Sequence, residues 1–157
     1  MSTPTTAAAL IDHILTRFHE VHRHELPGIV RLARELESKG ARPTMADDLD
    51  SMAQALEQHM FKEEMRLFPM MEQGGNSLIV QLIDDMQAEH LLHADAVAEL
   101  QGRLSDLRAP AGSEPEIAAL RAALGKLFDD LNRHMQLEDG TLFPMFAGWS
   151  ATRPRVP

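Results

Sequence analysis

The segment His59–Met70 reads HMFKEEMRLFPM, and it returns near the C-terminus over His134–Met145 as HMQLEDGTLFPM. Eight of the twelve aligned positions agree in character, and the two copies align without a gap. Both have the form His-Met-x-x-Glu-acid-x-x-Leu-Phe-Pro-Met. Such self-similarity indicates an internal repeat, so the two halves of the chain are predicted to be built alike.

Each copy places a histidine four residues before a glutamate, as His59 with Glu63 and His134 with Glu138. Residues i and i+4 share one face of an α-helix, so the two side chains of a pair point the same way. The apolar residues upstream recur every three or four residues, and continuing this spacing places each His–Glu pair on the same face of the helix. They are Met45, Leu49, Met52 and Leu56 in the first copy and Ile117, Leu120, Leu124, Leu127 and Leu131 in the second. The paired polar side chains are therefore predicted to face the core.

A buried carboxylate without a compensating charge costs several kcal/mol. A lone histidine on an apolar face is more often a satisfied core residue than a ligand. Here, however, the histidine and the glutamate recur together, at the same spacing, in two helices. We therefore predict that a metal ion compensates Glu63 and Glu138.

Composition limits the classes of function that remain. The chain has 157 residues, which suits one domain with a sizeable core, and its formal net charge is -9. This charge argues against nucleic acid and anionic membranes as partners, because both attract basic surfaces. The absence of cysteine excludes thiolate metal sites and disulfides within these residues. We see neither a signal peptide nor an apolar run long enough to span a bilayer, so a cytoplasmic protein is expected.

The apolar period is helical throughout, and Ala, Leu, Met, Glu and Arg dominate the composition. Breaks at glycine and proline predict four helices over about residues 6–39, 44–73, 77–107 and 113–143. Long helices with short connections form an up-down-up-down four-helix bundle, which is an all-α fold. We expect this single domain to occupy residues 1–150 and a flexible tail to occupy residues 151–157.

Local signals predict how the helices begin and bend. Pro27 is expected to kink the first helix. Thr44, with Asp47 three residues later, is expected to cap the second, and Ser113 with Glu116 is expected to form a capping box for the fourth.

Two further histidine pairs precede the repeated segments, and they leave alternatives open. His19 and His22 lie on the first helix, and His90 and His93 lie on the third. One residue of each pair can reach the level of His59 and His134, because the helical distances between them match to about one turn at ~1.5 Å per residue. Four helices could thus bring ligands to one layer.

The resulting donor set contains four imidazoles and two carboxylates. Such mixed ligands suit iron, and manganese or zinc would also suit them. Two carboxylates on different helices can each bridge two metal ions, which leaves coordination positions open for a small ligand. Apolar residues predicted to surround the site favour small neutral molecules; they are Met60, Phe61, Phe68, Met135 and Phe143.

The sequence resembles the hemerythrin-like HHE cation-binding family, and in particular the di-iron domain of iron-sulfur-cluster repair proteins. The resemblance covers about residues 9–146. It rests on Phe18-His19 with Glu25-Leu26-Pro27, on His59–Met70, on Glu89-His90, and on His134-x-x-x-Glu138 with Leu142-Phe143-Pro144.

The family resemblance implies a non-haem di-iron centre that reacts with nitric oxide, oxygen or peroxide. It further implies a role in nitrosative or oxidative stress, in which iron-sulfur proteins are repaired. It selects His19 and His90 from the two pairs. The implied metal ligands are His19, His59, Glu63, His90, His134 and Glu138.

Two departures from the family pattern leave a second reading open. Repair proteins of this kind usually carry an additional small domain with paired cysteines, which this sequence lacks. Oxygen-carrying hemerythrins have a histidine where this chain has Ala94, so fewer imidazoles would hold the metals. The alternative to repair is a carrier or sensor of oxygen or nitric oxide without catalytic activity, and a purely structural bundle is the least favoured interpretation.

The remaining polar residues near the repeats receive simpler interpretations. Glu64 and Asp139, which follow the two repeated glutamates, are expected to be solvated. His22 and His93 are expected either to lie behind the ligands and contact them or to lie at the rim of the site, with His93 as a candidate additional ligand. Glu89 is expected to line the approach to the metals.

Overall fold

The computed structural model describes residues 4–149, and this part of the chain contains helices and no β-strand. The helices run as four rods. The first comprises α1 (Ala7–Ile14), the π-helical turn η1 (Leu15–His19) and α2 (Glu20–Ser38). The second comprises α3 (Ala46–Lys62), the π-helical turn η2 (Glu63–Leu67) and α4 (Phe68–Glu72). The third is α5 (Ile79–Ser105), and the fourth comprises α6 (Glu114–Leu137), the π-helical turn η3 (Glu138–Leu142) and the 3₁₀ turn η4 (Phe143–Met145).

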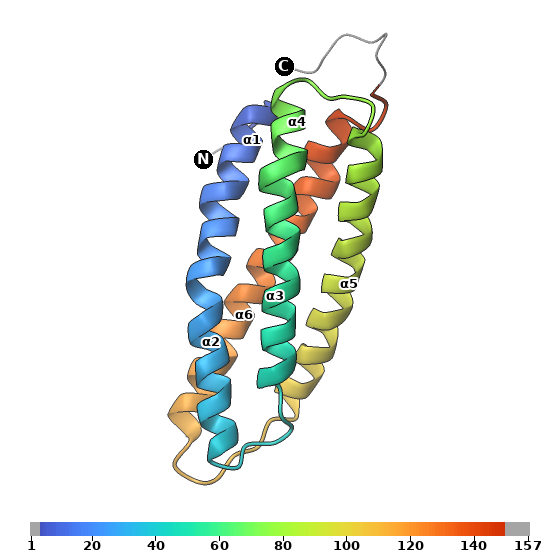
Figure 1. Cartoon of the computed structure of the whole chain (residues 1–157). Coiled ribbons are helices and arrows are strands. Elements are labelled where there is room, and N and C mark those ends of the chain that lie inside the picture. Colours follow the sequence, from blue (N-terminus) through green and yellow to red (C-terminus); the bar gives the residue numbers. More distant parts are fainter. Residues whose placement is uncertain (1–3, 150–157) are drawn as a thin grey trace.

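The rods pack side by side in antiparallel, up-down-up-down order (Figure 1). Helix α2 contacts both α3 and α6, and α5 contacts the same two helices. This arrangement confirms the predicted all-α four-helix bundle. Among residues 4–149, no helix is both long enough and apolar enough to cross a membrane.

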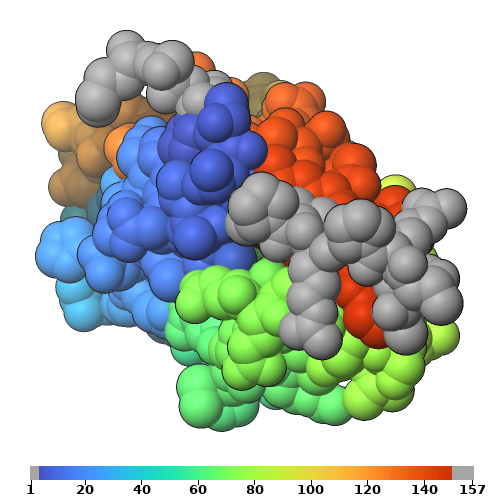
Figure 2. All heavy atoms as spheres, turned by 90° about the horizontal axis from the view of Figure 1, so that it is seen from above, coloured from blue at the N-terminus to red at the C-terminus, as the bar shows by residue number. Residues whose placement is uncertain are grey.

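The apolar core is divided into two parts along the bundle axis. One part joins α2, α3, α6 and the second half of α5 and includes Leu36, Leu49 and Leu124. The other joins α1, α4, η3, η4 and the first half of α5 and includes Ile14 and Phe68. The end-on view shows α1, α4 and the end of the fourth rod packed together at this second end (Figure 2). A buried polar layer lies between the two parts on every rod; it contains His19, His22, His59, Glu63, His90, His93, His134 and Glu138.

Three rods pass the polar layer through a π-helical turn, which the sequence did not predict. The turn η1 ends at His19, η2 begins at Glu63 and η3 begins at Glu138. A π-turn accommodates one more residue than an α-turn and is frequent at functional sites. Glu63, the first residue of η2, and Leu67, its last, are both buried. The helix continues beyond each turn, so the adjustment is local.

The predicted Thr44 cap for the second helix is wrong. Helix α3 begins after Met45, and no side chain at that position caps it. Instead, the carboxylate of Glu37 accepts hydrogen bonds from the backbone N–H groups of Met45 and Ala46, both at 2.8 Å. A charged acceptor at a helix N-terminus compensates free N–H groups and the helix dipole together. The cap therefore comes from the preceding helix.

Two further local predictions concern the start of α6 and the course of the first rod at Pro27. Ser113 lies at the N-cap of α6, but its side chain accepts no capping hydrogen bond, so the expected capping box with Glu116 does not form. Helix α2 continues through Pro27, and the first rod departs from α-geometry at η1. The tail expected over residues 151–157 lies outside the described residues.

Candidate metal centre

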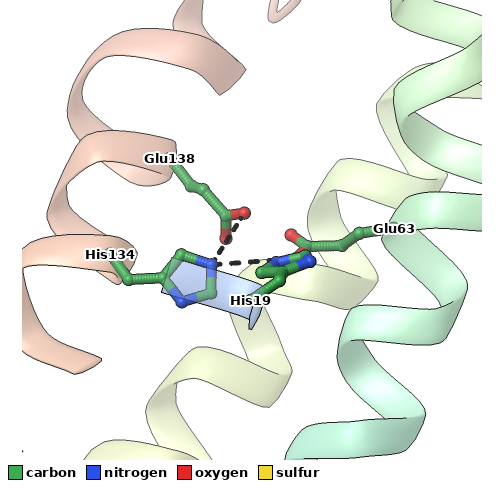
Figure 3. Close-up of side chains that lie close together, drawn as sticks. All are labelled: His19, Glu63, His134 and Glu138. Atoms are coloured by element: carbon green, nitrogen blue, oxygen red, sulfur yellow. Dashed lines mark hydrogen bonds and ion pairs between the residues drawn. The ribbon is translucent and has the colours of Figure 1, made fainter. Parts of the chain in front are cut away.

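The two copies of the repeat meet the histidines of the other rods in the polar layer. His19, Glu63, His134 and Glu138 point toward one another from the first, second and fourth rods (Figure 3). His19 Nε2 lies 3.1 Å from Glu63 Oε1, and His134 Nε2 lies 3.2 Å from Glu138 Oε2. His134 Nε2 is also 3.9 Å from Glu63 Oε1. One ligand atom from each of the four residues could therefore contact a single metal ion.

A second set of four residues lies beside the first. It consists of His59, Glu63, His90 and Glu138, and it shares both glutamates with the first set. His90 Nε2 lies 2.9 Å from Glu138 Oε1, and His59 Nε2 lies 3.5 Å from Glu63 Oε2. The two imidazole Nε2 atoms are 3.2 Å apart. The structure thus brings together all six residues that the sequence suggested as ligands.

The two glutamates direct one oxygen toward each set. Glu63 presents Oε1 to His19 and Oε2 to His59, while Glu138 presents Oε2 to His134 and Oε1 to His90. This is the orientation of a carboxylate that bridges two cations. Glu63 Oε2 and Glu138 Oε1 are buried and make no hydrogen bond of good geometry, and the imidazole nitrogens beside them belong to the second set, at 3.5 Å for His59 Nε2 and 2.9 Å for His90 Nε2. Since a buried carboxylate oxygen needs a partner, these two atoms fit a metal ion.

The Nδ1 atom of each of the four imidazoles, which points away from the centre, also has a hydrogen-bond partner. Nδ1 of His19 lies 2.7 Å from Glu64 Oε2, Nδ1 of His59 lies 2.9 Å from Glu89 Oε1, and Nδ1 of His90 lies 2.9 Å from Asp139 Oδ1. Because a carboxylate only accepts, these three imidazoles donate from Nδ1, which leaves Nε2 facing the centre as the atom that would bind a metal ion. Such partners fix the tautomer and the orientation of a metal-binding histidine.

The expectation that Glu64 and Asp139 are merely solvated is therefore wrong, although the side chain of Asp139 is 41% exposed. Both residues bond an imidazole of the centre, and Glu64 is additionally held by Arg23, whose Nη1 lies 2.7 Å from its Oε2. The signal was present in the sequence, because an acid follows the glutamate in both copies of the repeat. A repeated acid with no partner in its own helix indicates a partner elsewhere.

His134 differs from the other three imidazoles, because its Nδ1 contacts another histidine. His22 Nε2 lies 3.2 Å away, and both rings are buried. Burial, together with the neighbouring His134, lowers the pKa of His22 to about 3, so this ring is neutral. His22 thus lies behind the imidazole of His134, which is one of the two positions expected for it, and it is buried and not at the rim. His93 is buried as well.

The electrostatics of the layer favour charged carboxylates. Burial works to lower the pKa of His59, but Glu138 and Glu63 outweigh it and raise that pKa to about 11. Burial also opposes the charge on His90, whereas Asp139 and Glu138 raise its pKa to about 9. Burial opposes the charge of Glu138, yet the imidazoles around it hold its pKa well below the usual value. In the absence of metal, protons therefore occupy the imidazole nitrogens, and a metal ion would have to displace them on binding.

Aromatic rings from the repeats cover the imidazoles. Phe68 stacks on His19 with ring centroids 5.8 Å apart, and Phe143 stacks on His90 at 5.9 Å. These two phenylalanines belong to the Leu-Phe-Pro-Met ends of the repeats, so those ends shape the site as well as the core. Phe61 was predicted to lie nearby, but its side chain is 57% exposed. That prediction is wrong.

One side of the layer is open. A surface groove of about 470 Å³ between α5 and the fourth rod reaches His90, and its lining includes Ala94, Met135, Asp139 and Gly140. Small side chains at Ala94 and Gly140 leave this space free. A small molecule could approach His90 from here.

Comparison with known proteins agrees with this geometry. Residues 10–146 match the model of the hemerythrin HHE cation binding domain. The chain belongs to this family. The buried cluster of histidines and glutamates is accordingly a metal site, and the family resemblance seen in the sequence is confirmed.

Several relatives are named as iron-sulfur cluster repair proteins. The chain is 34% identical over 144 residues to the iron-sulfur cluster repair protein YtfE of Edwardsiella ictaluri, covering 88% of this chain and 65% of that protein. It is 37% identical over 138 residues to the iron-sulfur cluster repair protein DnrN of Neisseria gonorrhoeae, covering 86% of this chain and 88% of that protein. A probable iron-sulfur cluster repair protein of Haemophilus influenzae is 33% identical over 147 residues, which cover 90% of this chain and 66% of that protein. The chain therefore spans about two thirds of the length of some of these relatives and most of another.

Proposed function

We propose that the protein holds two iron ions in the buried layer and uses them to repair iron-sulfur proteins damaged by nitric oxide, oxygen or peroxide. The observation that carries the proposal is the orientation of Glu63 and Glu138, each with one oxygen toward each set of imidazoles. Each ion would then have two terminal imidazoles and a share of both carboxylates. The names of the relatives support iron-sulfur proteins as targets.

The proposed ligands are divided between the two ions. His19 and His134 would hold one ion, and His59 and His90 would hold the other. The donor set of imidazole nitrogens and carboxylate oxygens suits iron, with manganese and zinc as competitors. Iron bound there would supply the ability to bind nitric oxide and to exchange electrons with oxygen species.

The chain's own residues would control access and charge around the ions. Glu64, Glu89 and Asp139 keep three imidazoles oriented with Nε2 inward. Phe68 and Phe143 cover two of the rings, which limits the entry of water. Small neutral molecules can approach along the groove at Ala94.

The repair function is tested with a dehydratase whose iron-sulfur cluster has been damaged by nitric oxide or peroxide. The iron-loaded full chain is expected to restore its activity, and the metal-free chain and the Glu63→Gln/Glu138→Gln variant are expected not to. Glu57→Gln, a surface change that leaves the imidazoles untouched, serves as the matched control. Equal recovery with the metal-free chain, or with the same amount of ferrous salt, would contradict the proposal.

The alternative function of a carrier or sensor is distinguished in the same preparation. A carrier would bind oxygen reversibly, and vacuum would return the reduced form. We expect oxygen to oxidise the loaded protein instead. Ala94 stands where oxygen-carrying hemerythrins have a histidine, so the ions would have one imidazole ligand fewer and would keep positions open. A reversible oxygen spectrum without repair of the dehydratase would favour the carrier.

A further inference from the structure

The two candidate metal positions differ in what lies behind their imidazoles. At the position of His59 and His90, both rings donate a hydrogen bond from Nδ1 to a carboxylate. At the other position His19 also has a carboxylate partner, but the Nδ1 atom of His134 lies 3.2 Å from Nε2 of His22. One position is therefore backed by two carboxylates, and the other is backed by one carboxylate and one imidazole.

The repeat explains how this difference arises. The residue directly before the first histidine is Phe18 in the first half of the chain and Glu89 in the second. Glu89 accepts the hydrogen bond of His59. Phe18 instead stacks on His134, with ring centroids 5.4 Å apart and an angle of 10° between the planes. A phenyl ring offers no oxygen to Nδ1, so His22 of α2 takes the place of the acceptor.

The hydrogen bond fixes the state of both rings. If His134 holds an ion through Nε2, its proton lies on Nδ1 and is donated to Nε2 of His22. His22 then carries its own proton on Nδ1, and this atom is buried and has no hydrogen-bond partner. A second proton on this ring would place a cation in the core without a partner of its own, which is costly. His22 therefore backs His134 as a neutral acceptor.

No carboxylate passes negative charge to His134 through His22. The buried carboxylate on this side is that of Asp130, one turn before His134 on α6. Its Oδ1 accepts from Arg17 Nη2 at 2.9 Å, and its Oδ2 accepts from Lys126 Nζ at 2.9 Å. The charge of Asp130 is thus compensated by two cations, and the Nδ1 atom of His22 remains without a partner.

We propose that His22 makes the His19/His134 position the one that releases its ion, so that this position supplies iron to a damaged cluster while the His59/His90 position keeps its ion. A carboxylate acceptor makes an imidazole a stronger donor to a metal, and loss of such a partner lowers metal affinity about 10–100-fold. His22 acts through His134 and is therefore a positioning residue. Iron as the delivered species rests on the proposed function, whereas the difference between the positions rests on the hydrogen bonds.

The remaining position stays complete after one ion has left. Glu63 Oε2 lies 3.5 Å from His59 Nε2, and Glu138 Oε1 lies 2.9 Å from His90 Nε2. The retained ion would thus keep two imidazoles and one oxygen of each carboxylate. The other ion leaves as Fe²⁺, so no electron is transferred, and the vacated imidazoles take up protons from water.

The test measures how fast the two ions leave. The full chain, loaded anaerobically with two ferrous ions, is mixed in a stopped-flow instrument with an excess of a chromogenic ferrous chelator. Wild-type protein is expected to release one ion at least about tenfold faster than the other. His22→Glu gives His134 a charged acceptor and is expected to slow the fast phase at least about tenfold, whereas loss of a residue that only packs would accelerate it. His22→Gln keeps a neutral acceptor and is expected to retain both rates.

A change at the other position tests the same difference without altering a buried residue. Asp139→Asn removes a carboxylate from behind His90. It is expected to accelerate the slow phase and to leave the fast phase unchanged, because the fast ion is bound elsewhere. His24→Glu introduces the same side chain as His22→Glu at an exposed position of α2 and serves as the matched control.

The outcomes separate this inference from the proposed function. A fast phase that Asp139→Asn accelerates, or that His22→Glu leaves unchanged while circular dichroism shows a folded chain, would overturn the role of His22. If His22→Glu does not fold, Asp139→Asn alone decides. Fewer than two ions per chain before mixing would contradict both proposals. The expected two phases without transfer of the released iron to the damaged dehydratase would count against the proposed function alone.

Discussion

At the scale of single residues, the site depends on what lies behind the imidazoles. His19, His59 and His90 each donate from Nδ1 to a carboxylate. His134 alone is backed by a neutral ring, that of His22. A carboxylate partner makes an imidazole a stronger donor to a metal than a neutral partner does. The two proposed metal positions would therefore differ chemically, although the repeat makes them look alike.

Replacing Glu64 tests the value of such a partner. Glu64→Gln is expected to weaken metal binding by about 10–100-fold, because His19 loses the charged acceptor that fixes its tautomer. The measurement is the competition of the loaded protein with a chelator of known affinity. Glu57→Gln is the matched control, since Glu57 bonds the same Arg23 but no imidazole. Equal losses in both variants would show that the Arg23 ion pairs matter and the contact with His19 does not.

The pKa shifts predict how pH affects the metal-free protein. His59 and His90 have folded-state pKa values raised to about 11 and about 9. Their stabilising contribution is fully present below the unfolded pKa of about 6.5 and is lost as pH rises through the folded values. His22 and His93 have pKa values lowered to about 3 and about 4, so stability also falls as pH drops below about 6.5.

We therefore expect the metal-free chain to be most stable near pH 6.5, as measured by urea unfolding. Between pH 7 and pH 9 it should lose at least about 1 kcal/mol, because one unit of pKa difference corresponds to about 1.4 kcal/mol. Metal affinity should change in the opposite direction and rise with pH, since binding displaces protons. A metal-free stability that rises from pH 7 to pH 9 would contradict the charge assignment of the layer.

Much of this residue-level picture could be predicted from the sequence. The spacing of His59 with Glu63 and of His134 with Glu138 placed four polar side chains on the core face. The partners of Glu64, Asp139 and His22 could not be assigned, because these partners lie on other rods and the contacts depend on how the rods are rotated. The helical period does not determine that rotation to within one side chain.

At the scale of the elements, the π-helical turns were also beyond the reach of sequence patterns. Each turn holds or adjoins a candidate ligand: His19 in η1, Glu63 in η2 and Glu138 in η3. Apolar residues on either side of a π-turn still face the core, so the pattern reads as one continuous helix. The adjustment serves the polar layer, and the packing around it is preserved.

Deletion of Arg66 from η2 tests this interpretation. Removing one residue is expected to convert η2 into regular α-helix and to retain the fold, because Leu67 and Phe68 would stay on the core side. Metal binding is expected to weaken at least about tenfold, since a binding constellation tolerates displacements of only about 0.5 Å. The measurements are circular dichroism and chelator competition, with Arg66→Ala as the control that keeps the turn. Unchanged affinity in the deletion variant would show that the π-turn has no role in binding.

At the scale of the whole molecule, the polar layer divides the apolar core and at the same time connects all four rods. Glu63 and Glu138 come from the second and fourth rods, and His19 and His90 come from the first and third. A metal ion in either set would thus link several rods at mid-height. Since binding to the folded state alone adds to stability, metal loading should also raise the melting temperature.

The most direct test of the account is the iron content of the full chain after anaerobic loading and removal of unbound metal. We predict two iron ions per chain in the wild type, and loss of both in the Glu63→Gln/Glu138→Gln variant, because each carboxylate contributes to both positions. Circular dichroism of the same samples checks that the variant remains helical. A single ion per chain in the wild type, or an unchanged content of two ions in the variant, would contradict a shared pair of sites.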